Sequence, residues 1–113
     1  MKKYFFINNA YWKIMKHFAV FIKYKADLND IISIQDIHRN ILKQGVENEV
    51  ILVSGPFEPR TGGLVIMRSE SIATAKDFFK DDPYLKNNYA EYSFYEFKPG
   101  KHQPFLNEWI EKN

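Results

Sequence analysis

The chain has 113 residues, of which 45% are hydrophobic and 27% are charged, and its formal net charge at pH 7 is +2. This length suits one domain with a single core, and the balance of apolar and charged residues excludes an intrinsically disordered chain. So small a charge gives no reason to expect nucleic acid or an acidic membrane as a partner. The absence of cysteine excludes disulfides and thiolate chemistry.

The first residues superficially resemble a signal peptide. Their apolar run, residues 4–7, is short and no small-residue cleavage site follows it. No segment reaches the roughly 18 apolar residues of a membrane span. We therefore predict a cytoplasmic protein without a membrane partner. Residues 1–15 are either an N-terminal extension outside the domain, with Met15 as the true start, or an apolar arm packed on the body or on a partner.

The first regular pattern is an alternation over residues 17–25, which predicts a strand, and a polar break at residues 27–30 follows it. Four side chains share its strongly apolar face: Phe18, Val20, Ile22 and Tyr24.

The period becomes helical over residues 34–48, with Ser33 as the expected N-cap. The apolar stripe of this helix contains Ile34, Ile37, Ile41 and Leu42. His38 falls on the same stripe, so we expect its imidazole to be directed at the sheet.

Further along, the patterns predict strands at 49–54 and 64–67, a helix capped by Ser71, a strand at 89–97 and a short docked helix after Pro104. The second helix is expected to end at Asp82-Pro83, because proline forbids its continuation. Proline also pushes Asp82 toward an extended conformation, which directs its carboxylate away from the helix.

The order β-α-β-β-α-β over residues 16–99 predicts an α+β, ferredoxin-like domain, in which two helices cover one face of a four-stranded antiparallel sheet. A C-terminal tail with a short helix occupies residues 100–113. The strands at 49–54 and 64–67 are apolar on both faces, which is typical of a sheet covered on both sides. We therefore predict a homodimer in which a second copy covers the open face.

The stretch from Lys16 to Pro99 resembles the YCII-related (YciI-like) family, of the dimeric α+β barrel type. The segments that carry the resemblance are His17–Ile22, His38, Ser54–Phe57, Gly62-Gly63, and the helix Ser71–Lys80 leading into Asp82-Pro83-Tyr84. The resemblance implies a small dimeric protein whose active site is marked by His38 and Asp82. It also implies a similarity to enzymes of chlorinated aromatic breakdown and to muconolactone-isomerase-like proteins.

The chain departs from the family pattern at two turns. Glu49 stands where the family usually has a glycine after the first helix, and Asn48 is expected to take the left-handed conformation there. Asn87-Asn88 replace a glycine that often follows the Asp-Pro pair.

A His–Asp pair suits acid/base catalysis, because the carboxylate fixes the imidazole tautomer and raises its basicity. Proton abstraction, as in a lyase or isomerase acting on a cyclic or aromatic-derived substrate, fits this equipment. Around the pair we predict a substrate pocket in which Ser54 donates to an oxyanion, Arg60 binds a carboxylate, and Tyr24 and Gly55 line the wall. No cofactor is expected, and no two histidines have metal-ligand spacing with a nearby carboxylate.

Simpler interpretations stay open. His38 is alternatively a satisfied core histidine, Asp82 a helix stop, Ser54 a strand-end hydroxyl and Arg60 a solvated loop residue. Asp81 competes with Asp82 as the acid, although a solvated charge is the simpler role for it. His17 and His102 are predicted to lie on the surface. Two other functions are a non-catalytic dimer that binds a small ligand or a partner, and a haem protein in which His38 ligates iron.

Overall fold

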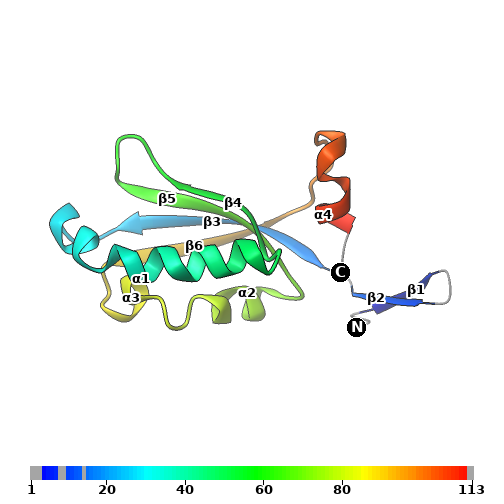
Figure 1. The fold of residues 1–113 in the computed structure, drawn as a ribbon, viewed down its shortest axis with the longest axis horizontal. Coiled ribbons are helices and arrows are strands. Elements are labelled where there is room, and N and C mark those ends of the chain that lie inside the picture. Colours follow the sequence, from blue (N-terminus) through cyan, green and yellow to red (C-terminus); the bar gives the residue numbers. More distant parts are fainter. Residues whose placement is uncertain (1–3, 8–9, 14, 112–113) are drawn as a thin grey trace.

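A four-stranded antiparallel sheet forms the body of the molecule, and three of the helices pack on one of its faces (Figure 1). The computed structural model describes residues 4–7, 10–13 and 15–111. Across the sheet the strands are β4 (Ile51–Pro56), β5 (Gly62–Ser69), β3 (Lys16–Tyr24) and β6 (Ala90–Phe97). The helices are α1 (Leu28–Glu47), α2 (Ile72–Phe78) and α3 (Pro83–Lys86). This arrangement confirms the predicted ferredoxin-like fold.

The central strand β3 pairs with β5 on one side and β6 on the other, so Val20 lies opposite both Val65 and Phe94. The predicted alternation is present, because Phe18, Val20 and Ile22 are buried under the helices while Phe21 on the other face is exposed. The fully buried core also contains Ile31, Met67, Ala75, Phe79 and Tyr84. Burial of each large apolar side chain stabilises the fold by about 1.5–3 kcal/mol.

Helix α1 begins earlier than predicted. Asp27 is its N-cap and Ser33 lies inside it, so the prediction of Ser33 as the cap is wrong. The apolar stripe extends back to Ile31, which is fully buried, and this burial outweighs the polar residues 27–30. At the other end, Glu49 takes the left-handed conformation with φ 62°, whereas Asn48, which was predicted to take it, has φ −88°.

Helix α2 is capped by Ser71, whose Oγ accepts a hydrogen bond from the Thr74 amide at 3.1 Å, as predicted. The helix ends at Phe78, four residues before Asp82. Asp82-Pro83 does not terminate it, contrary to the prediction, but begins the separate helix α3. Asn88, in the turn between α3 and β6, has φ 57°, which places the left-handed residue where the family often has glycine.

The remaining elements lie beside this body. The described residues before β3 form β1 (Tyr4–Ile7) and β2 (Ala10–Lys13), which pair in a two-stranded sheet of their own (Figure 1). After β6 come a 3₁₀ turn, η1 (Pro104–Leu106), and α4 (Asn107–Glu111), which is the short helix predicted after Pro104. Among the helices in the described ranges, none is both long enough and apolar enough to cross a membrane.

The C-terminal helix α4 corrects the prediction that His17 lies on the surface. His17 is only 7% exposed, because the Trp109 ring packs 5.5 Å from its own. Trp109 is held there by hydrogen bonds from its indole to the Glu49 carbonyl (3.0 Å) and from Arg68 to its own carbonyl (3.0 Å). His102 is exposed, as predicted.

Candidate active site

Asp82 owes its position to the residue that follows it. Pro83 occupies the first turn of α3, a position that tolerates its missing N–H, and Asp82 becomes the N-cap in an extended conformation. Its Oδ1 accepts a hydrogen bond from the Tyr84 amide at 3.0 Å. The carboxylate is therefore directed inward and Asp82 is fully buried, whereas its neighbour Asp81 is exposed.

His38 meets this carboxylate from α1. The imidazole Nδ1 lies 2.7 Å from Asp82 Oδ2, and His38 is only 7% exposed. The two residues are separated by 44 positions in the chain, and the stripe of α1 together with the α2–α3 turn brings them together. The juxtaposition predicted from sequence is thus present, while the catalytic role of the pair stays a prediction.

A third group on the carboxylate was missed in the sequence. The Tyr92 hydroxyl, on β6, donates to Asp82 Oδ2 at 2.5 Å. Burial, followed by the negative charge of Asp82, raises the pKa of Tyr92, so this hydroxyl stays protonated at neutral pH. The signal in the sequence was weak: Tyr92 alternates with Phe94 on the core face, and a buried tyrosine hydroxyl usually requires a partner.

Tyr84 covers one face of the histidine. Its ring stacks on His38 with a centroid distance of 3.9 Å and an interplanar angle of 15°, and its edge meets Tyr24 at 5.9 Å. Tyr84 is 1% exposed, and burial raises its pKa to about 12. With Nδ1 bound and one face covered, His38 is fixed in orientation. Its Nε2 forms no hydrogen bond within the described part of the chain.

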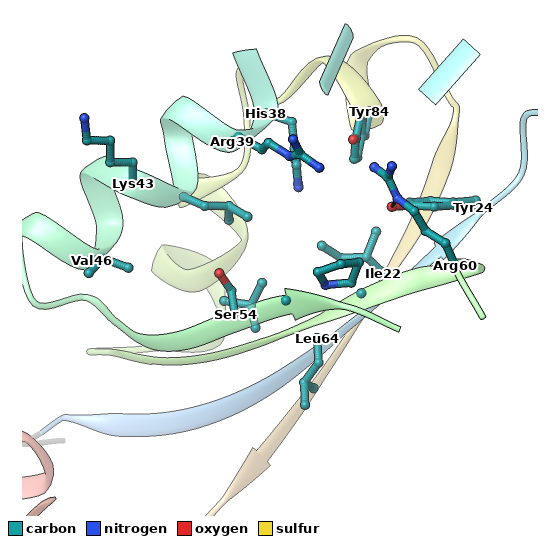
Figure 2. Close-up of a pocket in the computed structure, with 15 residues that line it drawn as sticks. Ile22, Tyr24, His38, Arg39, Lys43, Val46, Ser54, Arg60, Leu64 and Tyr84 are labelled. Atoms are coloured by element: carbon teal, nitrogen blue, oxygen red, sulfur yellow. Dashed lines mark hydrogen bonds between the residues drawn. The ribbon is translucent and has the colours of Figure 1, made fainter. Parts of the chain in front are cut away.

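His38 opens onto a cavity of about 290 Å³ between α1 and the strands (Figure 2). All four residues predicted for the substrate pocket line it: Tyr24, Ser54, Gly55 and Arg60. The Ser54 hydroxyl extends into this space and forms no hydrogen bond with a described residue (Figure 2). Asp82 does not line the cavity and lies behind the imidazole.

Arg60 is not a freely solvated loop residue. Its guanidinium donates to Gln35 Oε1 at 2.8 Å and approaches the Tyr24 hydroxyl at 3.4 Å. The bond to Tyr24 raises the pKa of Arg60, which keeps its charge permanent. Because Gln35 lies on α1, these contacts join the β4–β5 loop to the helix at one end of the cavity.

Two further cations of the cavity lining, Arg39 and Lys43, were also missed. Both lie on α1 close to His38. The helical pattern identifies residues of the buried face, and Arg39 and Lys43 are exposed, so the pattern gave no reason to single them out. Figure 2 shows Arg39 extending toward the cavity, whereas the Lys43 ammonium points away from it. Within the described ranges, no group of three or more His, Asp or Glu side chains is arranged to hold a metal ion.

Comparisons with known proteins agree with the fold. The model of the YCII-related domain matches residues 15–98. A solved structure with the same fold, with a TM-score of 0.61 and 22% identity, covers 79% of this chain and 97% of its own. It is 5-chloro-2-hydroxyhydroquinone dehydrochlorinase (TftG) from Burkholderia phenoliruptrix AC1100, in complex with 2,5-dihydroxybenzoquinone. Among curated proteins there is no match. The family model covers most of the chain, which therefore belongs to the YCII-related family.

Proposed function

We propose that this protein is an enzyme of lyase or isomerase type, in which His38 and Asp82 move a proton of a small cyclic or aromatic-derived substrate. The observation that carries the proposal is the 2.7 Å contact between His38 Nδ1 and the fully buried Asp82 carboxylate, beside a cavity that His38 lines. A structural histidine of the core needs a hydrogen-bond partner but no opening to a cavity.

The geometry supports a division of roles. Asp82 accepts the Nδ1 hydrogen, so the lone pair of the neutral ring lies on Nε2. Nε2 takes a proton from a substrate carbon, and the electrons of the C–H bond form a double bond. In an elimination, this double bond forms as a leaving group departs with its own electron pair. In an isomerisation, the imidazolium returns the proton to another atom of the substrate. The adjacent carboxylate stabilises the imidazolium, and such a step contributes about 10²–10⁴-fold to the rate.

A hydroxyl group of the lining can stabilise the negative charge that develops on a substrate oxygen. Ser54 has no partner within the described part of the chain, so its O–H is available to an oxyanion. The structural neighbour supports a planar ring as substrate, since it is named a dehydrochlorinase and binds 2,5-dihydroxybenzoquinone. We carry the reaction type to this chain as part of the proposal.

We also propose that the working unit is a homodimer, formed through the sheet face opposite α1, α2 and α3. Phe21, Tyr95 and Phe97 are exposed on this face, and Val53 is 55% exposed on the edge strand β4. Apolar side chains gathered on one surface are typical of an interface. Light scattering at micromolar concentration tests this proposal: a dimer mass is expected, and a monomer mass would contradict it.

Proton transfer is tested by following solvent exchange and product formation in D₂O by NMR. The probes are 5-chloro-2-hydroxyhydroquinone and a panel of unsaturated lactones. We expect His38→Gln to slow conversion at least 100-fold and Asp82→Asn at least 10-fold. His102→Gln, which alters an exposed histidine, is the matched control and should leave the rate unchanged.

Equal rates for wild type and His38→Gln would contradict the dyad. A protein that binds the probes without converting any of them would favour the alternative of a non-catalytic ligand-binding dimer. Haem binding through His38 finds less support, because a cavity of about 290 Å³ has room for one ring rather than for a tetrapyrrole.

A further inference from the structure

We infer that the cavity selects a substrate bearing a carboxylate, which Arg39 and Arg60 bind while the rest of the molecule reaches His38. The inference rests on the proposed function in one respect, since it assigns the substrate class to the same cavity. It adds Arg39 as a residue that determines specificity and defines which end of the substrate is charged.

The charge of the cavity lining points to an anion. The lining holds the guanidinium groups of Arg39 and Arg60 and no Asp or Glu, and its third cation, Lys43, points its ammonium away from the cavity (Figure 2). Among the described residues, neither arginine forms an ion pair, whereas Lys43 lies 4.0 Å from Glu47. Two uncompensated guanidinium groups at one cavity attract an anionic ligand and repel a cationic one.

Arg60 is positioned before any ligand arrives. Its contacts with Gln35 (2.8 Å) and Tyr24 (3.4 Å) use two of the five N–H donors of a guanidinium. A further side-chain contact, with Tyr84, fixes the group more firmly, and the donors that remain can bind an oxygen pair. A guanidinium matches a planar carboxylate through two parallel hydrogen bonds, and a pre-positioned group loses less conformational freedom on binding.

The remainder of the lining limits the size and polarity of the ligand. A volume of about 290 Å³ lies at the small end of ligand pockets and suits a single ring. Apolar side chains from the sheet and from α1 form much of the wall: Ile22, Leu42, Val46 and Val65. The apolar wall would contact the ring of such a ligand, and the two arginines would bind its carboxylate. Such positioning brings a carbon-bound hydrogen of the ring close to His38 Nε2.

The inference is tested with three probes of similar shape: benzoate, its neutral isostere benzamide, and phenol. Binding to the full chain is followed by NMR through the His38 Hε1 signal and the arginine Nε–H signals. We expect benzoate to bind at least tenfold more tightly than benzamide or phenol. Arg39→Gln and Arg60→Gln should each weaken benzoate binding about tenfold or more, because each removes charge-assisted hydrogen bonds.

Lys43→Gln is the matched control, since it removes a cation from the same helix whose ammonium points away from the cavity (Figure 2). We expect it to change benzoate affinity less than threefold. Equal binding of benzamide and benzoate, unchanged affinity in either arginine variant, or an equal loss in Lys43→Gln would overturn the inference. Inorganic phosphate that displaces benzoate completely at equal concentration would also overturn it, because the site would then bind any anion.

His38→Gln separates this inference from the proposed function. We expect this variant to keep the wild-type preference for benzoate over benzamide, because the arginines and not the imidazole discriminate the charge of the ligand. Arginine-dependent binding of benzoate together with rates that His38→Gln leaves unchanged would reject the dyad and support the carboxylate site. Histidine-dependent conversion that is equally fast for lactones with and without a carboxylate would reject the carboxylate site and support the dyad.

Discussion

The molecule contains two buried histidines in opposite electrostatic surroundings. His38 and His17 are each 7% exposed. His38 lies beside the Asp82 carboxylate, whereas His17 lies beneath Trp109 and beside Arg68, and its Nε2 has no hydrogen-bond partner in the described part of the chain. Burial lowers the pKa of His17; a hydrogen bond with the Ile110 backbone opposes this effect, and the positive charge of Arg68 adds to it.

The comparison shows that burial alone does not make a histidine an acid/base catalyst. An imidazole that must accept a proton needs a neighbouring negative charge and an opening for the proton donor. His38 has both, because Asp82 contacts one nitrogen and the cavity adjoins the ring. His17 has neither and is held neutral, so its role is to fill space between the sheet and α4.

The largest expected effect follows from removing the negative charge at the His38 site. Asp82→Ala deletes the acceptor of three hydrogen bonds, from His38, Tyr92 and the Tyr84 amide. We expect the free energy of unfolding to fall by about 3–5 kcal/mol, since buried donors lose their partner. Urea denaturation measures the change. The control Asp81→Ala, on an exposed carboxylate, should cost less than about 0.5 kcal/mol, and equal losses would refute the assignment.

A smaller effect is expected from the third member of the same cluster. Tyr92→Phe removes one hydrogen bond to Asp82 and retains the ring contact with Phe79. The free energy of unfolding should fall by about 1–2 kcal/mol. Tyr95→Phe, on the exposed face, is the matched control and should be nearly neutral. A neutral Tyr92→Phe variant would mean that the hydroxyl contributes nothing to the position of the carboxylate.

We expect His17 to make the free energy of unfolding depend on pH. Its pKa in the folded protein lies below the unfolded value of 6.5, so the unfolded chain binds more protons between these two values. The contribution of His17 is fully present above pH 6.5 and is lost as the pH falls toward the folded pKa, by at most about 1.4 kcal/mol per pH unit. Unfolding free energies measured between pH 8 and 5.5 should fall more steeply in wild type than in His17→Gln. Parallel curves would show that His17 is not held neutral.

The smallest effect concerns the turn that supports Trp109. Glu49 has φ 62°, a conformation that costs a residue with a side chain about 1–2 kcal/mol but is accessible to glycine. We expect Glu49→Gly to raise the free energy of unfolding by no more than about 0.5 kcal/mol, after the greater entropy of the unfolded glycine and the lost attraction between Glu49 and Arg68 are subtracted. Asn48→Gly, at φ −88°, should lower it. Thermal unfolding of the two variants compares them, and stabilisation by the second alone would contradict the assignment of strain to Glu49.

Local patterns predicted the two central residues of the candidate site. The helical stripe identified His38, and the restriction that proline places on its predecessor identified Asp82, because both signals lie within a few residues of the group concerned. Tyr92 and Arg39 could not be found in this way, since their roles depend on which side chains tertiary packing brings together. The buried position of His17 was missed for the same reason, because it depends on a helix more than ninety residues away.

The fold followed a similar division. The order of strands and helices was predictable from their periods, whereas the start of α1 was not, because burial of Ile31 decides it. The separate helix α3 was also missed. A single Asp-Pro pair is compatible with the end of one helix or with the beginning of another, and the sequence alone does not distinguish them.

The tautomer of neutral His38 decides whether Asp82 prepares the imidazole to accept a proton from the cavity. Long-range ¹H–¹⁵N NMR of the imidazole distinguishes a protonated Nδ1 from a protonated Nε2. We expect neutral His38 to carry its hydrogen on Nδ1, facing Asp82, and Asp82→Asn to change this preference. A neutral ring protonated on Nε2 in the wild type would leave no base facing the cavity and would contradict the account.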